Sequence, residues 1–237
     1  MTTGDVHGGN GSATSWRDRA LAVFPAGSNG EFGIPISEIP ILARGEGPRV
    51  WDTEGRAYLD FTMAWGSALP GHAHPKIREA VTAALPDGYN FAAVHRRSVE
   101  LAERLHEVIP CAERIRFVAS GTEATMMCLR VAQAATGRPK VLKFEGAYHG
   151  QHPVGIASML NGQPVSLPQS DPSGTGASWI GEGVLVAPFN DLETTRTILE
   201  AHAADLAAVI VEPLHRCLAP APGFLAGLRE LTRRLGV

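Results

Sequence analysis

Residues 115–125 have the sequence Ile-Arg-Phe-Val-Ala-Ser-Gly-Thr-Glu-Ala-Thr. The apolar run Ile115–Ala119 predicts a short buried strand, and Glu123–Ala135 has the pattern of a helix. The turn 120–122 therefore joins a strand directly to a helix. The first N–H groups of a helix lack intrahelical acceptors and lie at the positive end of its dipole, so such a turn can bind an anion. Gly121 would let the backbone approach closely, and the hydroxyls of Ser120 and Thr122 can donate to phosphate oxygens.

The same turn has a simpler interpretation without any ligand. Ser120 and Glu123 have the spacing of a capping box, in which each side chain bonds the backbone of the other residue. Taken alone, the tripeptide favours this cap. The sequence contains neither a G-x-x-x-x-G-K-[ST] loop nor a G-x-G-x-x-G placed between a strand and a helix, which argues against the standard nucleotide-binding loops.

Outward from this turn, apolar strands alternate with amphipathic helices. Downstream we expect strands at 141–144, 184–188 and 207–211, with helices at 192–202 and 224–235. Upstream we expect helices at 16–24, from 75 and from 98, and a hairpin of 49–51 with 57–61 that turns at Gly55. Residues 151–182 have no clear periodicity and predict a long loop. Alternating strands and helices indicate an α/β fold with a mainly parallel sheet covered on both faces.

Composition narrows the class of protein. The chain has 237 residues, 44% of them hydrophobic, and a net charge of −3, so no nucleic-acid partner is indicated. Cys111, Cys128 and Cys217 form neither a disulfide framework nor a zinc-binding spacing. Residues 1–15 are rich in Gly, Ser and Thr and predict a disordered tail, not a signal peptide, and no apolar run has the length of a membrane span. These features favour a cytoplasmic protein that does not enter a membrane.

A series of motifs in fixed order accompanies the turn. Residues 120–125 are followed by Gly-Arg-Pro-Lys at 137–140 and by Phe-Glu-Gly-Ala-Tyr-His-Gly at 144–150. Trp-Asp-x-x-Gly at 51–55 and Gly-His-Ala-His-Pro at 71–75 precede them, whereas Asn-Asp-Leu at 190–192, Val-Ile-Val-Glu-Pro at 209–213 and Pro-Gly-Phe-Leu at 222–225 follow. The set resembles class III (fold-type I) pyridoxal-phosphate aminotransferases, especially their glutamate-1-semialdehyde aminomutase-like branch, over nearly all of residues 16–237.

The resemblance implies a fold-type I PLP-transferase large domain preceded by an N-terminal segment of the small domain. We expect the tail at 1–15, the N-terminal segment with its hairpin at 16–72, and an incomplete PLP-binding large domain at 73–237. The large domain is expected to be truncated because Gly236 has the character of a helix C-cap and Val237 that of the first residue of a further buried strand.

The resemblance also implies the site and its cofactor, pyridoxal 5′-phosphate. Tyr148 would stack on the pyridine ring, and Glu212 would either bond polar groups around the ring or merely end its strand. Trp65 and, more weakly, Ser28 match positions that contact substrate. The cofactor-binding residues implied are Ser120, Gly121, Thr122, Tyr148, His149 and Glu212.

The implied activity is transfer of an amino group between an amino compound and an oxo acid or aldehyde, by a homodimer with its active site between two subunits. The lysines are Lys76, Lys140 and Lys143, and none matches the family's Schiff-base position, which is expected beyond Val237. The chain alone is therefore expected to be inactive and poorly soluble. A non-catalytic PLP-binding or oligomerisation module that pairs with a separate chain is an alternative.

The sequence differs from the aminomutase branch at two places, and these differences bear on which reaction is catalysed. Cys217 lies where the aminomutase branch usually has an asparagine, and Ala-Ala-Val-His at 92–95 replaces the typical Gly-Ala-Pro-Thr. Both favour an aminotransferase, with the aminomutase as an alternative. A metal hydrolase built from histidines is a weaker alternative, because no carboxylate motif accompanies them and the family motifs account for most of them. The histidines concerned are His72, His74, His149 and His152.

Overall fold

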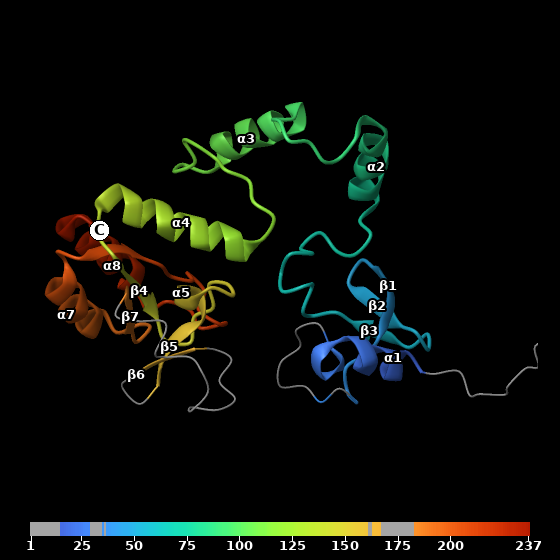
Figure 1. Ribbon diagram of the computed structural model, residues 1–237, viewed down its shortest axis with the longest axis horizontal. Helices are drawn as coiled ribbons and strands as arrows, with labels where there is room; N and C mark the ends of the chain where they lie inside the picture. The colour runs from blue at the N-terminus through green and yellow to red at the C-terminus, as the bar shows by residue number, and fades with distance from the viewer. Residues whose placement is uncertain (1–14, 29–34, 36, 161–162, 167–182) are drawn as a thin grey trace, which may run out of the picture. The chain divides into compact units, whose positions relative to one another are not determined.

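The computed structural model describes residues 15–28, 35, 37–160, 163–166 and 183–237 (Figure 1). The chain forms two compact units, residues 1–107 and 108–237. The division between residues 72 and 73, which rests on the family resemblance, stays a prediction. The predicted tail lies outside the described residues except for Ser15, which caps the first helix through a bond from the Asp18 N–H to the Ser15 Oγ at 3.1 Å.

The N-terminal unit contains a small antiparallel sheet in the order β1-β2-β3. Its second helix begins at Pro75, as predicted, because a proline at the first helical position loses no intrahelical hydrogen bond. The elements are α1 (Trp16–Val23), η1 (Pro25–Gly27), β1 (Leu42–Glu46), β2 (Arg49–Asp52), β3 (Ala57–Leu59), α2 (Pro75–Ala84), η2 (Leu85–Asp87) and α3 (Arg96–Val108).

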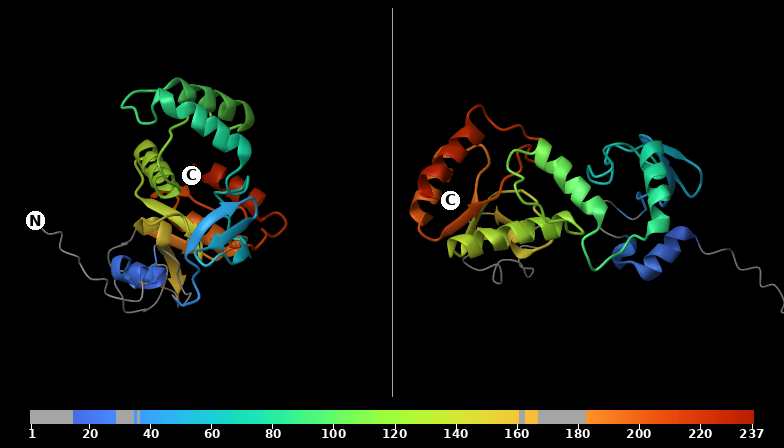
Figure 2. Two further views of the ribbon diagram at one scale, coloured as in Figure 1. Left: turned by 90° about the vertical axis from the view of Figure 1, so that its right-hand side faces the viewer. Right: turned by 90° about the horizontal axis from the view of Figure 1, so that it is seen from above.

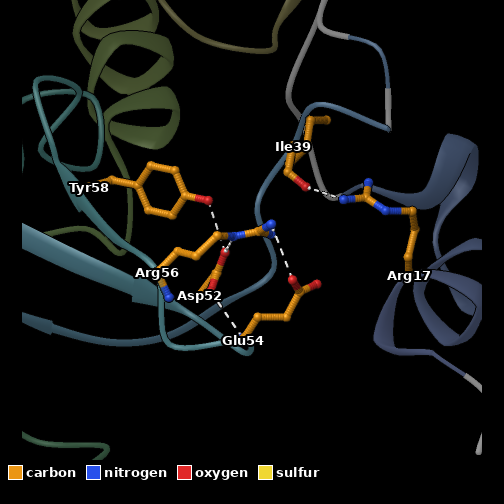
Figure 3. Close-up of polar contacts among 6 residues, drawn as sticks. All are labelled: Arg17, Ile39, Asp52, Glu54, Arg56 and Tyr58. Carbon is orange, nitrogen blue, oxygen red and sulfur yellow. Dashed lines mark hydrogen bonds and ion pairs between the residues drawn. The ribbon is translucent and has the colours of Figure 1, made fainter.

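The β2–β3 hairpin forms where the sequence predicts it and is organised by Asp52 (Figure 3). The buried Asp52 carboxylate accepts hydrogen bonds from the backbone N–H groups of Glu54 and Arg56 at 3.0 and 2.9 Å, from the Arg56 Nε at 2.7 Å and from the Tyr58 hydroxyl at 2.9 Å. Burial alone would raise the pKa of Asp52, but these bonds outweigh it and lower the pKa to about 2. Gly55 has φ +84° and makes the turn, as predicted.

The C-terminal unit is built on a parallel sheet in the order β7-β4-β8. Figure 2 shows α4 on one side of this sheet and α8 on the other, which confirms the predicted α/β arrangement. The elements are α4 (Gly121–Thr136), β4 (Lys140–Phe144), α5 (Pro153–Ile156), β5 (Ala157–Leu160), β6 (Gln163–Ser166), β7 (Val184–Ala187), α7 (Leu192–His202), β8 (Leu206–Val209) and α8 (Phe224–Leu235).

The core lies on both faces of β4. Leu142 and Phe144 are fully buried against α7 and α8, and the alternating residues Val141 and Lys143 are also fully buried. Phe144 contacts Phe224 of α8 edge to face, with ring centroids 5.5 Å apart. Because side chains alternate between the faces of a strand, burial on both faces requires covering layers on both sides of the sheet.

Two expectations about secondary structure are wrong. Residues 115–119 form no strand, because no described strand supplies their backbone with partners, and Phe117 is exposed. Within the segment predicted as loop, β5 and β6 form an antiparallel hairpin. The proline in β6 and the polar composition of the segment concealed this hairpin. Over the part of the chain that the structure describes, no helix is long and apolar enough to cross a membrane.

Candidate functional site

The turn before α4 has unpaired backbone donors. Ser120 is the N-cap, and its Oγ accepts from the Glu123 N–H at 3.2 Å, but the Glu123 carboxylate accepts from the N–H of Ala119 at 2.7 Å and not from that of Ser120. The predicted capping box is therefore only half formed. Within the described residues, the N–H groups of Gly121 and Thr122 have no acceptor, and a Cβ added to Gly121 would meet nothing within 4 Å. The turn thus offers donors and open space to an anion.

The segment that carries Tyr148 and His149 packs directly on this turn. Gly150 has φ +112°, and a Cβ there would lie 2.8 Å from the Thr122 Cα, so the close approach requires glycine. The Gln151 N–H donates to the Thr122 Oγ1 at 3.2 Å, and the Thr125 Oγ1 donates to the His149 carbonyl oxygen. The structure therefore brings together two predicted parts of the site that lie more than twenty residues apart in the sequence.

Glu212 holds the backbone of Tyr148. The Tyr148 N–H donates to the Glu212 Oε1 at 2.8 Å, and the Glu212 Oε2 accepts from the N–H of Arg216 at 3.4 Å. The Arg216 Nε donates to the Gly146 carbonyl at 3.0 Å, and its guanidinium carbon lies 5.7 Å from the centroid of the Tyr148 ring. The Tyr148 side chain itself is 40% exposed. Glu212 thus fixes the position of the tyrosine while leaving its ring accessible.

His149 is a buried histidine with an unpaired ring nitrogen. Only 7% of the residue is exposed, and no described residue forms a hydrogen bond with its Nε2. Burial, reinforced by the nearby Lys143 and opposed by Glu212, lowers the pKa of His149 to about 4. The ring is therefore neutral near pH 7 and has a free position for one hydrogen bond.

Lys143, which the sequence interpretation assigned no role in the site, lies beneath the same segment. Its Nζ donates to the carbonyl oxygens of Ala147 at 2.7 Å, of Gly155 at 3.1 Å and of Ala157. Burial lowers the pKa of Lys143 to about 8, with Glu212 opposing the shift. The available signal was a lysine inside an apolar strand, where a charged side chain needs hydrogen-bond partners.

The predicted substrate contacts lie in the N-terminal unit, and their role stays a prediction. Trp65 is 81% exposed with φ +57°. Ser28 follows η1 and lines a cavity of about 530 Å³ together with Phe24 and Leu42.

Two of the four histidines proposed for a metal site make other contacts. The Nε2 of His72 lies 2.7 Å from the Asp60 Oδ2, and the Nε2 of His152 lies 3.1 Å from the Thr125 Oγ1. Among the described residues, no group of three or more His, Cys, Asp or Glu is placed so that it could hold a metal ion.

Comparison with known protein families and sequences gives a consistent set of matches. A model of the family "Aminotransferase class-III" matches residues 36–237. A glutamate-1-semialdehyde 2,1-aminomutase of Chloroflexus aurantiacus is 41% identical over 227 residues, which cover 92% of this chain and 50% of the relative. One of Desulfitobacterium hafniense is 40% identical over 225 residues, covering 92% and 52%. The chain spans about half the length of the curated relatives it matches.

Solved structures give the same picture for the fold. An omega-transaminase from Sphaerobacter thermophilus superposes with a TM-score of 0.83 and 37% identity, covering 96% of this chain and 54% of that one. A transaminase with PLP bound superposes with a TM-score of 0.81 and 32% identity, covering 94% and 52%. Both matches again span about half of the longer chain.

Proposed function

The chain belongs to the class III aminotransferase family, and from this premise we propose that its C-terminal unit binds pyridoxal 5′-phosphate for the transfer of an amino group between an amino compound and an oxo acid or aldehyde. When bound, this cofactor supplies the aldehyde and the electron-withdrawing ring that amino transfer requires. The observation that carries the proposal is the packing of residues 148–151 onto a helix N-terminus that has unpaired donors.

The residues of the turn fit the phosphate group. The N–H groups of Gly121 and Thr122 are free to donate, and the absence of any described atom near a Cβ on Gly121 leaves room for the phosphate oxygens. Ser120 adds a hydroxyl, and the 16-residue helix α4 directs the positive end of its dipole at this point.

The residues around Tyr148 fit the ring. We assign the exposed face of Tyr148 to stacking on the pyridine, because Glu212 and Gly150 fix the backbone on either side of it. Neutral His149 offers its unpaired Nε2 to a polar group of the cofactor or to a bound water. Glu212 contributes by holding Tyr148 in place.

The substrates and the assembly are proposed from the family. Trp65 and Ser28 are proposed to contact the amino compound, and the parent enzyme is proposed to act as a homodimer in the cytoplasm. The most direct check on Trp65 and Ser28 is substitution of each with alanine in the longer enzyme, followed by measurement of KM for the amino donor.

The aminomutase reaction is a second candidate, favoured by the 41% identity with glutamate-1-semialdehyde 2,1-aminomutases. Against it, Cys217 replaces the asparagine typical of that branch, and a thiol is a weak hydrogen-bond donor. Isomerisation of glutamate 1-semialdehyde without an added amino donor would distinguish the two reactions.

We propose that a polypeptide of these 237 residues holds the cofactor without a covalent link and does not turn over. Lys143 is buried among three carbonyls, and Lys140 forms an ion pair with Asp205 at 2.7 Å, so neither amine is free to act as the Schiff-base lysine. Lys76 lies on α2 in the N-terminal unit.

The test is titration of the purified chain with pyridoxal 5′-phosphate, followed by absorbance and calorimetry. We expect saturable binding, no stoichiometric label on any single lysine after borohydride reduction, and no transamination. Replacing Tyr148 with alanine should weaken binding by about tenfold, the value of one aromatic stacking contact.

A matched control is available because the chain has three tyrosines. Tyr89→Ala removes an exposed tyrosine from the N-terminal unit and should leave the affinity unchanged. Equal affinities for wild type and Tyr148→Ala would contradict the assigned ring site, and absence of saturable binding would contradict cofactor binding altogether.

A further inference from the structure

Lys143 joins both ends of the segment that carries Tyr148. The lysine lies on the central strand β4 and is fully buried. One of its carbonyl partners, Ala147, directly precedes Tyr148, whereas the other two, Gly155 and Ala157, lie beyond the far end of the 148–152 stretch. One ammonium group therefore links the backbone before Tyr148 to the backbone at residues 155 and 157.

The chemistry of this contact is specific for an ammonium. A charged lysine has three N–H donors and no acceptor, and here it meets three carbonyl oxygens. A buried charge is tolerated only when such partners are present. A methionine of similar length would fill the space but would leave all three carbonyls without this donor.

The closed segment is packed tightly. The His149 N–H donates to the Gly155 carbonyl at 3.0 Å, and a Cβ added to Gly155 would lie 2.4 Å from the Gly150 carbonyl oxygen. The two limbs of the segment are therefore in backbone contact with each other. Movement of residues 155–157 would displace His149 and Gly150, which contact α4.

We propose that Lys143 is a positioning residue whose ammonium ties residues 147, 155 and 157 together and thereby holds Tyr148 and His149 against the N-terminus of α4. Its effect on the cofactor rests on the proposed function, but its effect on the backbone does not. The same contacts exclude Lys143 as a covalent anchor for the cofactor, because its amine is enclosed and all three of its protons are engaged.

The contact of the Lys143 ammonium with the carbonyls of Ala147, Gly155 and Ala157, called the clamp below, is sensitive to pH because of the charges near it. Glu212 favours the charged amine, and Arg216 disfavours it. His149 and His152 also interact with Lys143, but burial lowers the pKa of both, so both rings are already neutral at pH 7 and their charge does not change as the pH rises. Above about pH 8 the amine loses a proton and keeps two donors for three carbonyls.

The test compares Lys143→Met with Lys140→Met in the 237-residue chain. Lys140 is on the same strand but pairs with Asp205, so it controls for loss of a β4 lysine. Near pH 7, we expect amide hydrogen exchange in residues 145–157 to rise by about tenfold or more in Lys143→Met, with β7 unchanged, and to stay at the wild-type level in Lys140→Met. Pyridoxal 5′-phosphate affinity should fall by about tenfold in the first variant alone.

A pH series on the wild-type chain provides a readout that simple packing would not move. Between about pH 7 and pH 9.5, exchange of residues 145–157, corrected for its intrinsic pH dependence, should accelerate in wild type and not in Lys143→Met. The wild-type half of this pH series can still be measured if Lys143→Met fails to fold.

The outcomes separate the two proposals. Unchanged exchange in residues 145–157, in the variant and across the pH series, would overturn the clamp, as would a borohydride-fixed cofactor on Lys143. Loss of loop protection in a chain whose wild type binds no cofactor would support the clamp and overturn only the proposed function.

Discussion

At the scale of single residues, the Asp52 carboxylate fixes the turn between β2 and β3 by binding both its backbone and its side chains. Its side chain bonds the backbone at two points and two further side chains, and these bonds lower its pKa from 3.8 to about 2. Between those pH values the folded chain binds fewer protons than the unfolded chain. The stabilisation from Asp52 is therefore fully present above about pH 4 and is lost as the pH falls through 2.

We therefore predict that Asp52→Asn lowers the thermal unfolding midpoint near pH 7 and flattens its dependence on pH between about 4 and 2. The amide keeps one acceptor oxygen but loses the charge that attracts Arg56. Circular dichroism melts across this pH range measure both effects. Asp87→Asn is the control, because the ion pairs that Asp87 makes with described residues, Arg96 and Arg97, are exposed and long, at 3.7 and 3.6 Å. A midpoint in Asp52→Asn equal to that of the control would contradict the prediction.

The structure shows that Cys217 has a backbone conformation in which the choice between cysteine and asparagine matters. Arg216 and Cys217 have φ of +48° and +70°, in a tight turn closed by bonds between His215 and Leu218. The asparagine typical of the aminomutase branch enters the left-handed region more readily than cysteine. The departure at 217 thus affects the backbone of the turn beside Tyr148 as well as a possible hydrogen bond.

At the scale of elements, the contact between α4 and residues 148–151 is the step that assembles the candidate site. Gly150 permits it because a side chain there would clash with the Thr122 backbone and would also need an unfavourable φ of +112°. Gly137, at the other end of α4, has φ +68° but open space around a Cβ. Comparing the two glycines separates the cost of backbone strain from the cost of the clash.

We predict that Gly150→Ala destabilises the fold by about 1–3 kcal/mol and lowers the affinity for pyridoxal 5′-phosphate, because the loop must move away from the turn. Gly137→Ala should cost about 1–2 kcal/mol from the left-handed backbone alone and leave the affinity unchanged. Urea unfolding and cofactor titration measure the two quantities. Equal losses of affinity in both variants would show that the Gly150 contact does not shape the site.

Helices with clear ends were predictable from the sequence. Both α7 and α8 have the predicted bounds because their caps are local: the Asp191 Oδ1 accepts from the Thr194 N–H at 2.9 Å, and Gly236 adopts φ +67°. Residues 115–119 were mispredicted because an apolar run forms a strand only where another strand pairs with it. The hairpin of β5 and β6 has a local signal, because Asn161-Gly162 between its strands is the typical two-residue hairpin sequence, but Pro164 and the polar residues around it argue against a strand.

The candidate site was predictable only in part. The turn before α4 has a local signal, and the family motifs pointed to Tyr148 and Glu212, but nothing in their spacing says that Glu212 bonds the Tyr148 backbone. The three partners of Lys143 are backbone carbonyls, which any residue supplies, so no side-chain pattern marks them. Their convergence depends on the path of the loop.

At the scale of the whole molecule, the two units differ in how much apolar surface they bury. Both hydrophobic clusters lie in the C-terminal unit. Among the described residues of the N-terminal unit, Val50 is the only buried hydrophobic side chain, and α1 and α2 contain no buried residue. Hydrophobic burial is the main favourable contribution to folding, so the N-terminal unit has little to stabilise its helices.

We therefore predict a steep gradient of hydrogen-exchange protection along the chain. Amides of β4, β7, α7 and α8 should exchange slowly, through global unfolding of the C-terminal unit, whereas amides of α2 and α3 should exchange through local opening at least about a hundredfold faster. Exchange followed by mass spectrometry near neutral pH, with peptides covering 75–108 and 184–235, measures the difference directly. The hairpin of β2 and β3 serves as an internal comparison, because its Asp52 network should protect it more than α2. Equal protection of α2 and β4 in a monodisperse monomer would mean that α2 gains burial absent from the described contacts, and the prediction would then be wrong.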